Sequence, residues 1–291
     1  MSKRLRSTQR APRRGAGTSR RRRSLGQHFL INKAAARSIV ARFAPRPGEL
    51  VIEIGPGHGA LTDHIIEAGA RVIAVELDPR LGDELTARHA GAPGFRLVRG
   101  DVLARDIDAL CAGESVRVLA NIPYSITGEL ILKLLLAAPP LTAMTLMVQK
   151  EVADRIVAGP GSRTYGSLSV LTQYFTEPAL QMILRPGSFA PPPAVFSAVV
   201  AMPFRKRREL DAAVEKDYAR FVRDLFGNRR QTLRNNLRRS LSKLPPALFT
   251  AIVVEIENVG INLSRRPETL NRSEVLALHR RILEISKAPG R

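Results

Sequence analysis

The stretch Leu50-Val-Ile-Glu-Ile54, followed directly by Gly55-Pro-Gly-His-Gly59, decides the fold. The apolar run predicts a buried strand, and the closely spaced glycines let the backbone turn sharply after it. A helix is expected over residues 60–68, and residues 71–75 predict a second strand that ends at Glu76. A strand, a helix and a strand in this order are typical of a parallel α/β unit.

The same alternation continues on both sides of this unit. Further strands are predicted at residues 95–98, 116–120, 143–148 and 194–202. Further helices are predicted at residues 33–43, 79–89, 128–136 and 150–157. We therefore expect a parallel, doubly wound, Rossmann-like α/β sheet with right-handed crossovers.

The pattern changes after Phe204. Arg205-Lys-Arg-Arg208 suggests a hinge, and no further strand is expected beyond it. Helices are predicted at residues 214–226, at 229–241, over a short segment after Pro245-Pro246, and at 272–285. The expected parts are a disordered basic arm at 1–23, an α/β domain at 24–204 and a smaller all-helical C-terminal domain at 205–291.

The net charge of +20 is unevenly distributed along the 291 residues. Residues 1–23 hold ten basic side chains and no acid, whereas residues 24–204 hold sixteen of each sign. Residues 205–239 hold twelve basic and five acidic side chains. A neutral body with two basic segments indicates a polyanionic partner. A transit peptide remains an alternative for the arm, although Leu5 is its only large aliphatic residue.

Composition disfavours several other classes of protein. The single cysteine, Cys111, rules out a disulfide framework and a thiolate zinc site, and it fits a reducing cytoplasm. The five histidines lack metal-binding spacing, so we expect no metal. The longest apolar run is broken by Lys133 and Pro139-Pro140, so no membrane span is expected. We expect a cytoplasmic monomer.

Polar or glycine residues follow the carboxyl ends of four predicted strands, where open α/β sheets bind ligands. The first set is Gly55, Gly57 and Gly59, which let a ligand approach the backbone. Glu76 is placed to accept hydrogen bonds from ribose hydroxyls, and Asp101 from an adenine amino group. Two alternatives stay open: Glu76 as a solvated acid and Asp101 as a helix N-cap.

The fourth segment, Asn121-Ile-Pro-Tyr124, carries the chemistry. The amino nitrogen of adenine is a poor nucleophile because its lone pair is delocalised into the ring. The Asn121 side-chain oxygen and the Ile122 carbonyl are suited to accept its two hydrogens and direct the lone pair at an electrophilic methyl group. Pro123 stiffens the turn, and Tyr124 is suited to stack on an unstacked base. The alternative is an Asn-Pro turn with a core tyrosine.

These motifs resemble those of the S-adenosylmethionine-dependent adenine-N6 methyltransferases. The resemblance rests on EIGPGHG at 53–59, the acid at 76, GD at 100–101 and NIPY at 121–124. Four more segments are similar to the small-subunit ribosomal RNA adenine dimethyltransferases, which dimethylate two adjacent adenines near the 3′ end of that RNA. They are LGQHFL at 25–30, QKEVADRIVAGPGSRTYGSLS at 149–169, SFAPPPAVFSAVV at 188–200 and RRQTLRNNL at 229–237.

The resemblance extends over about residues 24–286 and implies contacts with S-adenosylmethionine. The implied residues are His28, Leu30, Gly55, Glu76, Asp101 and Asn121. His28 departs from the family, in which many members have asparagine, and a capping or core histidine is the alternative. The resemblance also places Phe189 against the target base, whereas a hydrophobic anchor for the proline-rich loop at 186–193 is the alternative.

A basic helix is expected to contact ribosomal RNA. Its candidate residues are Arg229, Arg230, Arg234, Asn235 and Arg238, with Leu233 and Leu237 on the opposite, buried side. A solvated charged face is the alternative. Three other functions remain open: a macrolide-resistance methyltransferase acting on large-subunit RNA, a non-catalytic assembly factor, and an NAD-dependent oxidoreductase, since Gly55-x-Gly57-x-x-Ala60 also fits a dinucleotide fingerprint.

Overall fold

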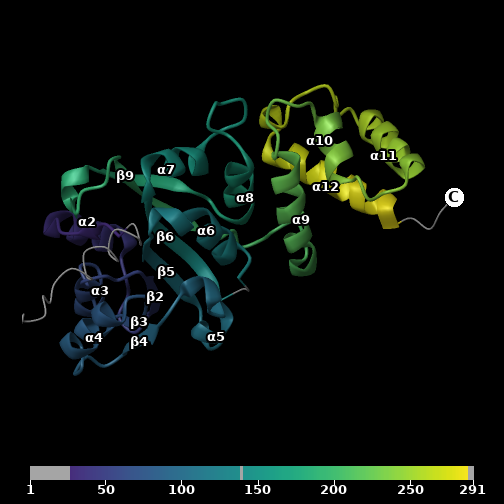
Figure 1. The fold of residues 1–291 in the computed structure, drawn as a ribbon. Helices are drawn as coiled ribbons and strands as arrows, with labels where there is room; N and C mark the ends of the chain where they lie inside the picture. The colour runs from purple at the N-terminus through teal and green to yellow at the C-terminus, as the bar shows by residue number, and fades with distance from the viewer. Residues whose placement is uncertain (1–26, 138–139, 288–291) are drawn as a thin grey trace, which may run out of the picture.

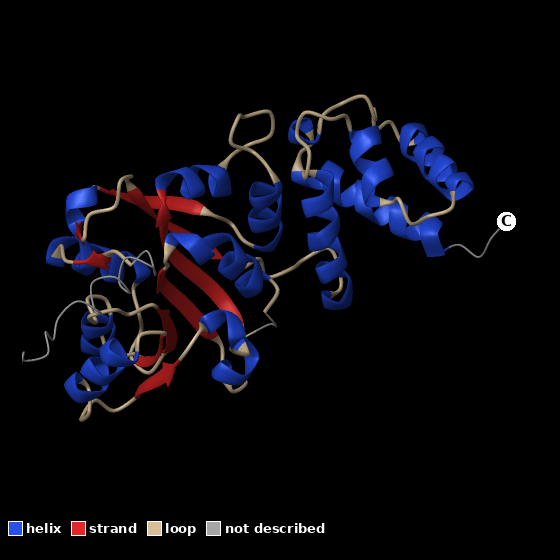
Figure 2. Cartoon of the chain, viewed as in Figure 1, coloured by secondary structure: helices blue, strands red, loops and turns tan. Residues whose placement is uncertain are grey.

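The computed structural model describes residues 27–137 and 140–287. Figure 1 and Figure 2 show a twisted sheet flanked by helices, with a separate group of helices beyond α8 (Ser167–Phe175). The basic arm predicted at residues 1–23 lies outside the described residues. The two-part architecture predicted from the sequence, an α/β sheet followed by helices, is confirmed.

The main sheet has seven strands in the order β4-β3-β2-β5-β6-β9-β7. Their bounds are Leu50–Ile54 for β2, Arg71–Glu76 for β3, Phe95–Arg99 for β4, Val116–Asn121 for β5, Leu141–Gln149 for β6, Ala179–Leu184 for β7 and Ser197–Pro203 for β9. The first five strands in this order, from β4 through β3, β2 and β5 to β6, are mutually parallel. Strand β9 runs antiparallel to both of its neighbours, β6 and β7.

The expectation of a wholly parallel sheet is therefore wrong at β9. The chain between β7 and β9 holds a proline-rich loop with one turn of 3-10 helix, at Pro186–Ser188. A parallel connection needs a crossover of a dozen or more residues that is usually an α-helix, whereas antiparallel strands can be joined by a loop. Without such a helix the chain returns in the opposite direction.

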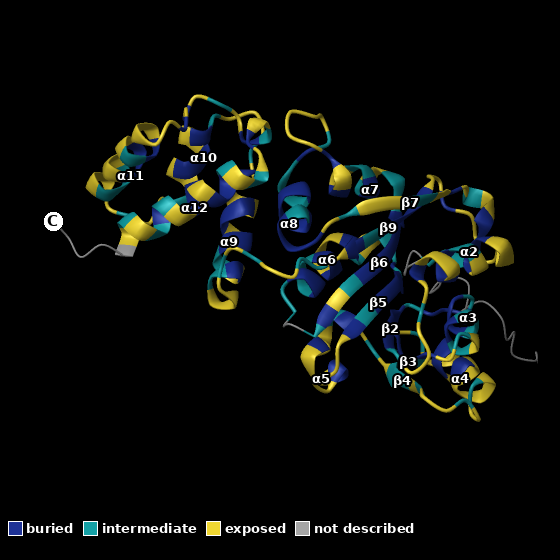
Figure 3. Cartoon of the chain, turned by 180° about the vertical axis from the view of Figure 1, so that it is seen from behind, coloured by how far each residue is buried: buried dark blue, intermediate teal, exposed yellow. Residues whose placement is uncertain are grey.

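Two helical layers cover the sheet. The helices of this domain are α2 (Lys33–Phe43), α3 (Thr62–Glu67), α4 (Pro79–Arg88), α5 (Ile107–Cys111), α6 (Thr127–Leu135), α7 (Lys150–Val157) and α8. Val51 and Leu119 face one apolar cluster with α2 and α3, while Ile52 and Val118 face another with α6, α7 and α8. Successive strand residues thus point to opposite covered faces, so the central strand β2 is buried along its whole length and its neighbours are mostly buried (Figure 3).

A two-stranded ribbon joins the start of the described chain to the proline-rich loop. Strand β1 (Phe29–Leu30) pairs antiparallel with β8 (Phe189–Ala190). The Ser188 carbonyl also accepts hydrogen bonds from the next two backbone N–H groups, of Ile31 and Asn32. The ribbon fixes the N-terminal segment beside a loop that is distant in sequence.

The C-terminal helices are α9 (Ala212–Leu225), α10 (Leu233–Ser240), α11 (Pro246–Asn258) and α12 (Arg272–Lys287). Two differ from the prediction: α10 starts four residues later, and α11 is a helix of 13 residues where a short one was expected. One apolar cluster runs from the sheet through α8 into α9 and α12. No helix in the described ranges combines the length and apolar character needed to cross a bilayer.

The linker at residues 205–208 is anchored on both sides. The Arg205 guanidinium donates to the Gln173 carbonyl and pairs with Glu177 at 2.9 Å. Arg208 pairs with the buried Glu215 of α9, and its guanidinium lies 5.6 Å from the centroid of the Phe175 ring. These contacts join the linker to α8 and α9, so it is not a free hinge in this structure.

Candidate active site

A cavity opens at the carboxyl ends of β2, β3 and β5, where the sequence predicted it. Nine predicted residues line it: His28, Gly55, Gly57, Glu76, Asp101, Asn121, Ile122, Pro123 and Tyr124. The strand register explains why these residues lie together, because β2 lies between β3 and β5 and pairs with both. The strand ends therefore deliver the glycine loop, the acid and the Asn121–Tyr124 segment to one edge of the sheet.

Gly55 and Gly57 form the tight turn after β2, and both adopt left-handed backbone conformations, with φ of +68° and +60°. A Cβ on Gly55 would lie 2.7 Å from the Asn121 carbonyl oxygen. A Cβ on Gly57 would lie 2.9 Å from the Phe29 ring. Both positions therefore require glycine, and the turn exposes backbone to the cavity.

Glu76 is a buried acid at the wall of the cavity, with 4% of its surface exposed. One carboxylate oxygen accepts from Gly57 N at 3.1 Å and the other from Asp78 N at 2.8 Å. Burial raises the pKa of Glu76, while these hydrogen bonds oppose the rise. Each oxygen retains another lone pair, so Glu76 can still accept from a ligand hydroxyl.

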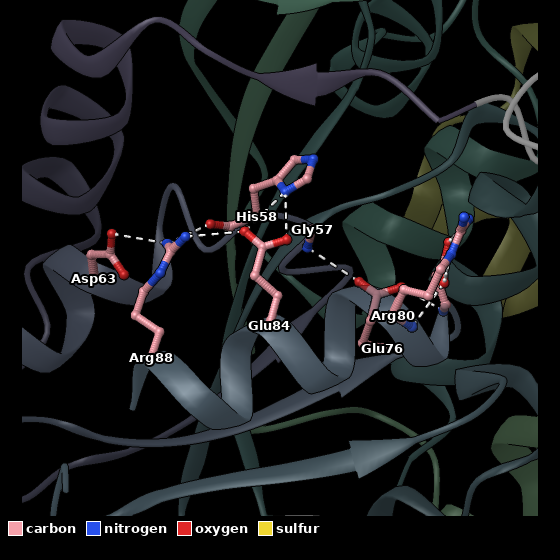
Figure 4. A network of polar contacts seen from close by, with 8 residues as sticks. Gly57, His58, Asp63, Glu76, Arg80, Glu84 and Arg88 are labelled. Carbon is pink, nitrogen blue, oxygen red and sulfur yellow. Dashed lines mark hydrogen bonds and ion pairs between the residues drawn. The ribbon is translucent and has the colours of Figure 1, made fainter. Parts of the chain in front are cut away.

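An ionic network holds the outer side of the glycine loop against α4 (Figure 4). Arg88 donates to the His58 carbonyl at 2.7 Å and pairs with Glu84 at 3.1 Å. Glu84 in turn contacts the His58 ring at 3.1 Å, and Arg88 also lies 3.5 Å from Asp63. The loop is thus held from inside by Glu76 and from outside by Arg88.

Asp101 serves two purposes. It is the N-cap of the short 3-10 helix at Val102–Ala104, and its side chain accepts from Leu103 N at 2.9 Å. This is the capping role that the sequence left open. The residue also lines the cavity, together with Leu77, a leucine that is 48% exposed. An acid beside an exposed apolar side chain suits a flat heterocycle with a polar edge.

Local contacts fix the Asn121–Tyr124 segment. Asn121 Nδ2 donates to the His28 carbonyl at 3.4 Å, and Ile122 N donates to the Met147 carbonyl at 3.4 Å. The Tyr124 hydroxyl is 2.7 Å from Ser197 Oγ on β9. Burial raises the pKa of Tyr124, so its hydroxyl stays protonated near neutral pH.

His28 lies over this segment from the N-terminal side. Its Nδ1 is 2.7 Å from the Pro191 carbonyl, and its ring centroid is 5.4 Å from that of Tyr124. His28 is therefore neither a helix cap nor a core residue. It connects the proline-rich loop to the cavity wall.

Three of the residues predicted to contact the cofactor or the target base do not line the cavity. Leu30 and Phe189 face each other in the β1–β8 ribbon and belong to the apolar core, and Phe189 is only 3% exposed. This placement favours the alternative that Phe189 anchors the proline-rich loop. Gly59 packs against α4 instead, where a Cβ would lie 3.0 Å from Leu85.

Several cavity residues escaped prediction. They are Gln27, Phe29, Ile54, Val75, Leu77, Gly100, Val102, Ser125 and Ile126. Phe29 was hidden because only the fold brings β1 to the glycine loop, where its ring lies 4.7 Å from that of His58. Leu77 had a local signal, since it directly follows Glu76 at the end of a strand.

A second buried acid, Glu53, also escaped notice although it belongs to the motif at 53–59. It is 1% exposed, and its carboxyl accepts from the Thr62 hydroxyl at 2.6 Å. Burial and, to a lesser extent, the nearby carboxylates of Asp63 and Glu76 together raise the pKa of Glu53 to about 8. The contact ties strand β2 to the start of α3 across the glycine loop.

The predicted basic helix is only partly as expected. Arg229 and Arg230 lie in the turn before α10, because Thr232 caps that helix by accepting from Asn235 N. Arg234 pairs with Glu257 of α11, and Arg238 lies 5.7 Å from the centroid of the Phe249 ring. The buried side is confirmed, since Leu233 and Leu237 are fully enclosed. Asn235 is exposed, and its amide donates to Gln231.

Comparison with known proteins agrees with this geometry. A ribosomal RNA small subunit methyltransferase A from Pelotomaculum thermopropionicum is 40% identical over 267 residues, covering 88% of this chain and 90% of that protein. One from Acidobacterium capsulatum is 38% identical over 257 residues, covering 88% and 89%.

Two solved structures share the fold over nearly their whole length. A dimethyladenosine transferase from Plasmodium falciparum has a TM-score of 0.76 at 24% identity and covers 89% of this chain and 98% of its own. The 23S rRNA methyltransferase ErmE has a TM-score of 0.64 at 25% identity and covers 87% and 99%. The family model described as ribosomal RNA adenine dimethylase matches residues 18–277. The chain therefore belongs to the ribosomal RNA adenine dimethylase family.

Proposed function

We propose that this protein transfers methyl groups from S-adenosylmethionine to N6 of two adjacent adenines near the 3′ end of small-subunit ribosomal RNA, giving dimethyladenosines. One observation carries the proposal: the Asn121–Tyr124 segment shares a cavity with Gly55, Gly57 and Glu76. Groups suited to a nucleoside-containing methyl donor thus adjoin groups suited to an adenine amino group.

The residues present fit S-adenosylmethionine. The backbone at Gly55 and Gly57 leaves no room for side chains and allows close approach of the donor. Glu76 would accept from its ribose hydroxyls, and Asp101 beside Leu77 would hold its adenine. His28 and Asn121 complete the wall. When bound, the cofactor supplies an electrophilic methyl group on a sulfonium.

The protein residues prepare the acceptor nitrogen. Asn121 Nδ2 is bonded to the His28 carbonyl, so its Oδ1 is left to accept one N6 hydrogen. The Ile122 carbonyl accepts the other, and the backbone just before this carbonyl is held because Ile122 N donates to the Met147 carbonyl. Accepting both hydrogens moves the nitrogen towards tetrahedral geometry and directs its lone pair at the methyl group in line.

Tyr124 holds the flipped base. Its hydroxyl bond to Ser197 fixes the ring, which stacks on adenine, and Pro123 limits the freedom of the turn. Because Phe189 is packed in the core, we assign the stacking role to Tyr124. A second transfer requires that the cavity readmit the monomethylated base or keep it while the cofactor exchanges.

Arg229, Arg230 and Asn235 of the C-terminal domain are exposed, and we propose that they bind RNA. Arg234 and Arg238 remain proposed contacts, although both already contact α11. Such contacts position RNA more than they specify its sequence. We further propose that the protein acts as a monomer in the cytoplasm, which sedimentation and cell fractionation would test.

Methyl incorporation with the modified nucleotide mapped tests this function. Labelled methyl should enter unmethylated small subunits and form dimethyladenosine at two adjacent positions. Label found only in naked large-subunit RNA, the class of RNA on which the 23S rRNA methyltransferase ErmE acts by its name, would show that the substrate assignment is wrong. Calorimetric titrations with S-adenosylmethionine and with NAD distinguish the methyltransferase from the oxidoreductase alternative. Binding of NAD without binding of S-adenosylmethionine would contradict the proposal.

A further inference from the structure

A second groove lies beside the candidate active site, and the proposed function does not use it. It is formed by α7, the loop between α7 and α8, the end of the proline-rich loop and the segment after α9. The residues that matter are Val195, Phe196, Arg155, Arg163 and Arg229. The groove therefore spans both parts of the chain.

Phe196 presents an aromatic ring to this groove. It is 47% exposed and its neighbour Val195 is 44% exposed, so both keep apolar surface in contact with water that burial against a partner would remove. The Phe196 carbonyl accepts from Lys150 N at 2.9 Å, so the backbone beneath the ring is fixed. The next residue, Ser197, bonds the Tyr124 hydroxyl. An exposed ring thus stands one residue from the anchor of the proposed base-stacking tyrosine.

Three arginines line the same groove as this ring. Arg155, Arg163 and Arg229 are exposed, and none has an ion pair with another described residue. Of the remaining charged residues, Lys150 is paired with Asp154 at 2.7 Å, which leaves the single acid Glu151. Exposed arginines interleaved with an aromatic ring are the composition of a surface that binds single-stranded nucleic acid.

We propose that this groove holds the single-stranded RNA that flanks the target adenine, with Phe196 stacked on a flanking base and the three arginines on its phosphates. The inference rests on the proposed function and extends it. Arg229, placed before α10, and Tyr124, placed in the cavity, are then connected by one continuous path for the RNA.

Substitutions at Phe196 test the stacking. In methylation of unmethylated small subunits, Phe196→Leu should raise KM about 5- to 100-fold, the range expected for loss of one base–aromatic stack, with kcat and the S-adenosylmethionine Kd unchanged. Phe196→Trp should restore KM. Ile183→Ala removes an equally exposed aliphatic side chain from β7 and should have no effect.

The arginines are tested by salt dependence. Arg155→Ala and Arg163→Ala should each raise KM. Each should also lower the slope of log KM against log salt concentration by about 1, because one phosphate contact is lost. If the wild-type enzyme is active and Phe196→Leu leaves KM unchanged, the RNA-groove inference is wrong and the proposed function still stands. An acidic peptide would then be the partner of the groove. Absence of transfer by the wild-type protein would instead refute the proposed function.

Discussion

At the residue scale, the cavity depends on a few side chains whose neighbours leave them one orientation. Asn121 is the clearest case. Its side-chain nitrogen Nδ2 donates a hydrogen bond to the His28 carbonyl. Its backbone carbonyl lies where any side chain on Gly55 would collide with it. The side chain and the backbone of one residue therefore shape both the acceptor site and the glycine loop.

Replacing Asn121 by alanine should remove the main acceptor for the adenine amino group. We expect methyl transfer to small subunits to fall at least about 100-fold while binding of the subunits persists, because positioning is lost and surface contacts are not. Single-turnover transfer and a subunit-binding assay measure the two effects. Asn258→Ala, at the exposed end of α11, is the matched control. Near-normal transfer by the Asn121 variant would eliminate the mechanism.

Glu53 gives a prediction about stability and pH. Its pKa is raised to about 8 in the folded protein, so between its ordinary value and pH 8 the unfolded chain releases a proton that the folded chain keeps. Stability contributed by the neutral acid is therefore complete at low pH and is lost as pH rises to 8. Glu53→Gln stays neutral, so it should lose less stability between pH 5 and pH 9.

The difference should be on the order of a few kcal/mol, and urea unfolding at the two pH values measures it. Glu129→Gln, an exposed carboxylate of α6, is the control and should behave like the wild type. Equal pH dependence in the wild type and Glu53→Gln would show that Glu53 is ionised in the fold.

At the element scale, the glycine loop is held by a strand and a helix that both follow it in the sequence. Glu76 at the end of β3 accepts from Gly57, and Arg88 of α4 donates to His58. Neither contact is local in sequence. The sequence could therefore identify the loop, but not the groups that keep it in shape.

Arg88→Ala should loosen this loop from the outside. We expect the S-adenosylmethionine Kd to rise roughly 3- to 10-fold, because a partly exposed charge-assisted hydrogen bond contributes on the order of 1 kcal/mol. Arg80→Ala is the control, since Arg80 pairs with Asp78 at the start of the same helix. Isothermal titration measures both. An unchanged Kd in the Arg88 variant would show that Glu76 alone is sufficient.

Elements with clear local signals were predictable. The helix at Lys33–Phe43 has the expected bounds because Asn32 caps it and Ala44 ends it before Pro45. In contrast, α8 and β7 were not predicted. Helix α8 is buried on most sides and lacks a polar face, so its sequence has no clear helical period. The start of α10 was misplaced because the capping role of Thr232 was overlooked.

At the scale of the whole molecule, the methyl-transfer chemistry and the proposed RNA contacts lie on different parts of one connected core. The apolar cluster that covers the sheet continues through α8 into α9 and α12. Contacts of Arg205 and Arg208 fix the connection. The sequence predicted the two parts, yet the interlocked junction depends on side chains that only the fold brings together.

The basic arm gives a prediction at this scale. Deleting residues 1–23 removes ten positive charges, so binding of small subunits should weaken in low salt, and the difference should vanish as salt rises. The S-adenosylmethionine Kd should stay the same. Both expectations are tested by measuring, at two salt concentrations, how tightly the full and the shortened chain bind small subunits and S-adenosylmethionine. A loss of cofactor binding on deletion would show that the arm belongs to the catalytic part.

The pairing of β1 with β8 has a consequence for the order of events during synthesis. His28 and the Pro191 carbonyl that it contacts are 163 residues apart, and β9, which holds Tyr124 through Ser197, comes later still. A nascent chain has therefore made the glycine loop, Glu76 and Asn121 long before it can close the pocket around them. The proposed methyl-donor site therefore gains its supports on His28 and Tyr124 only after the α/β part is complete, so a prematurely terminated chain lacking β8 and β9 would carry most of the signature residues without these two contacts.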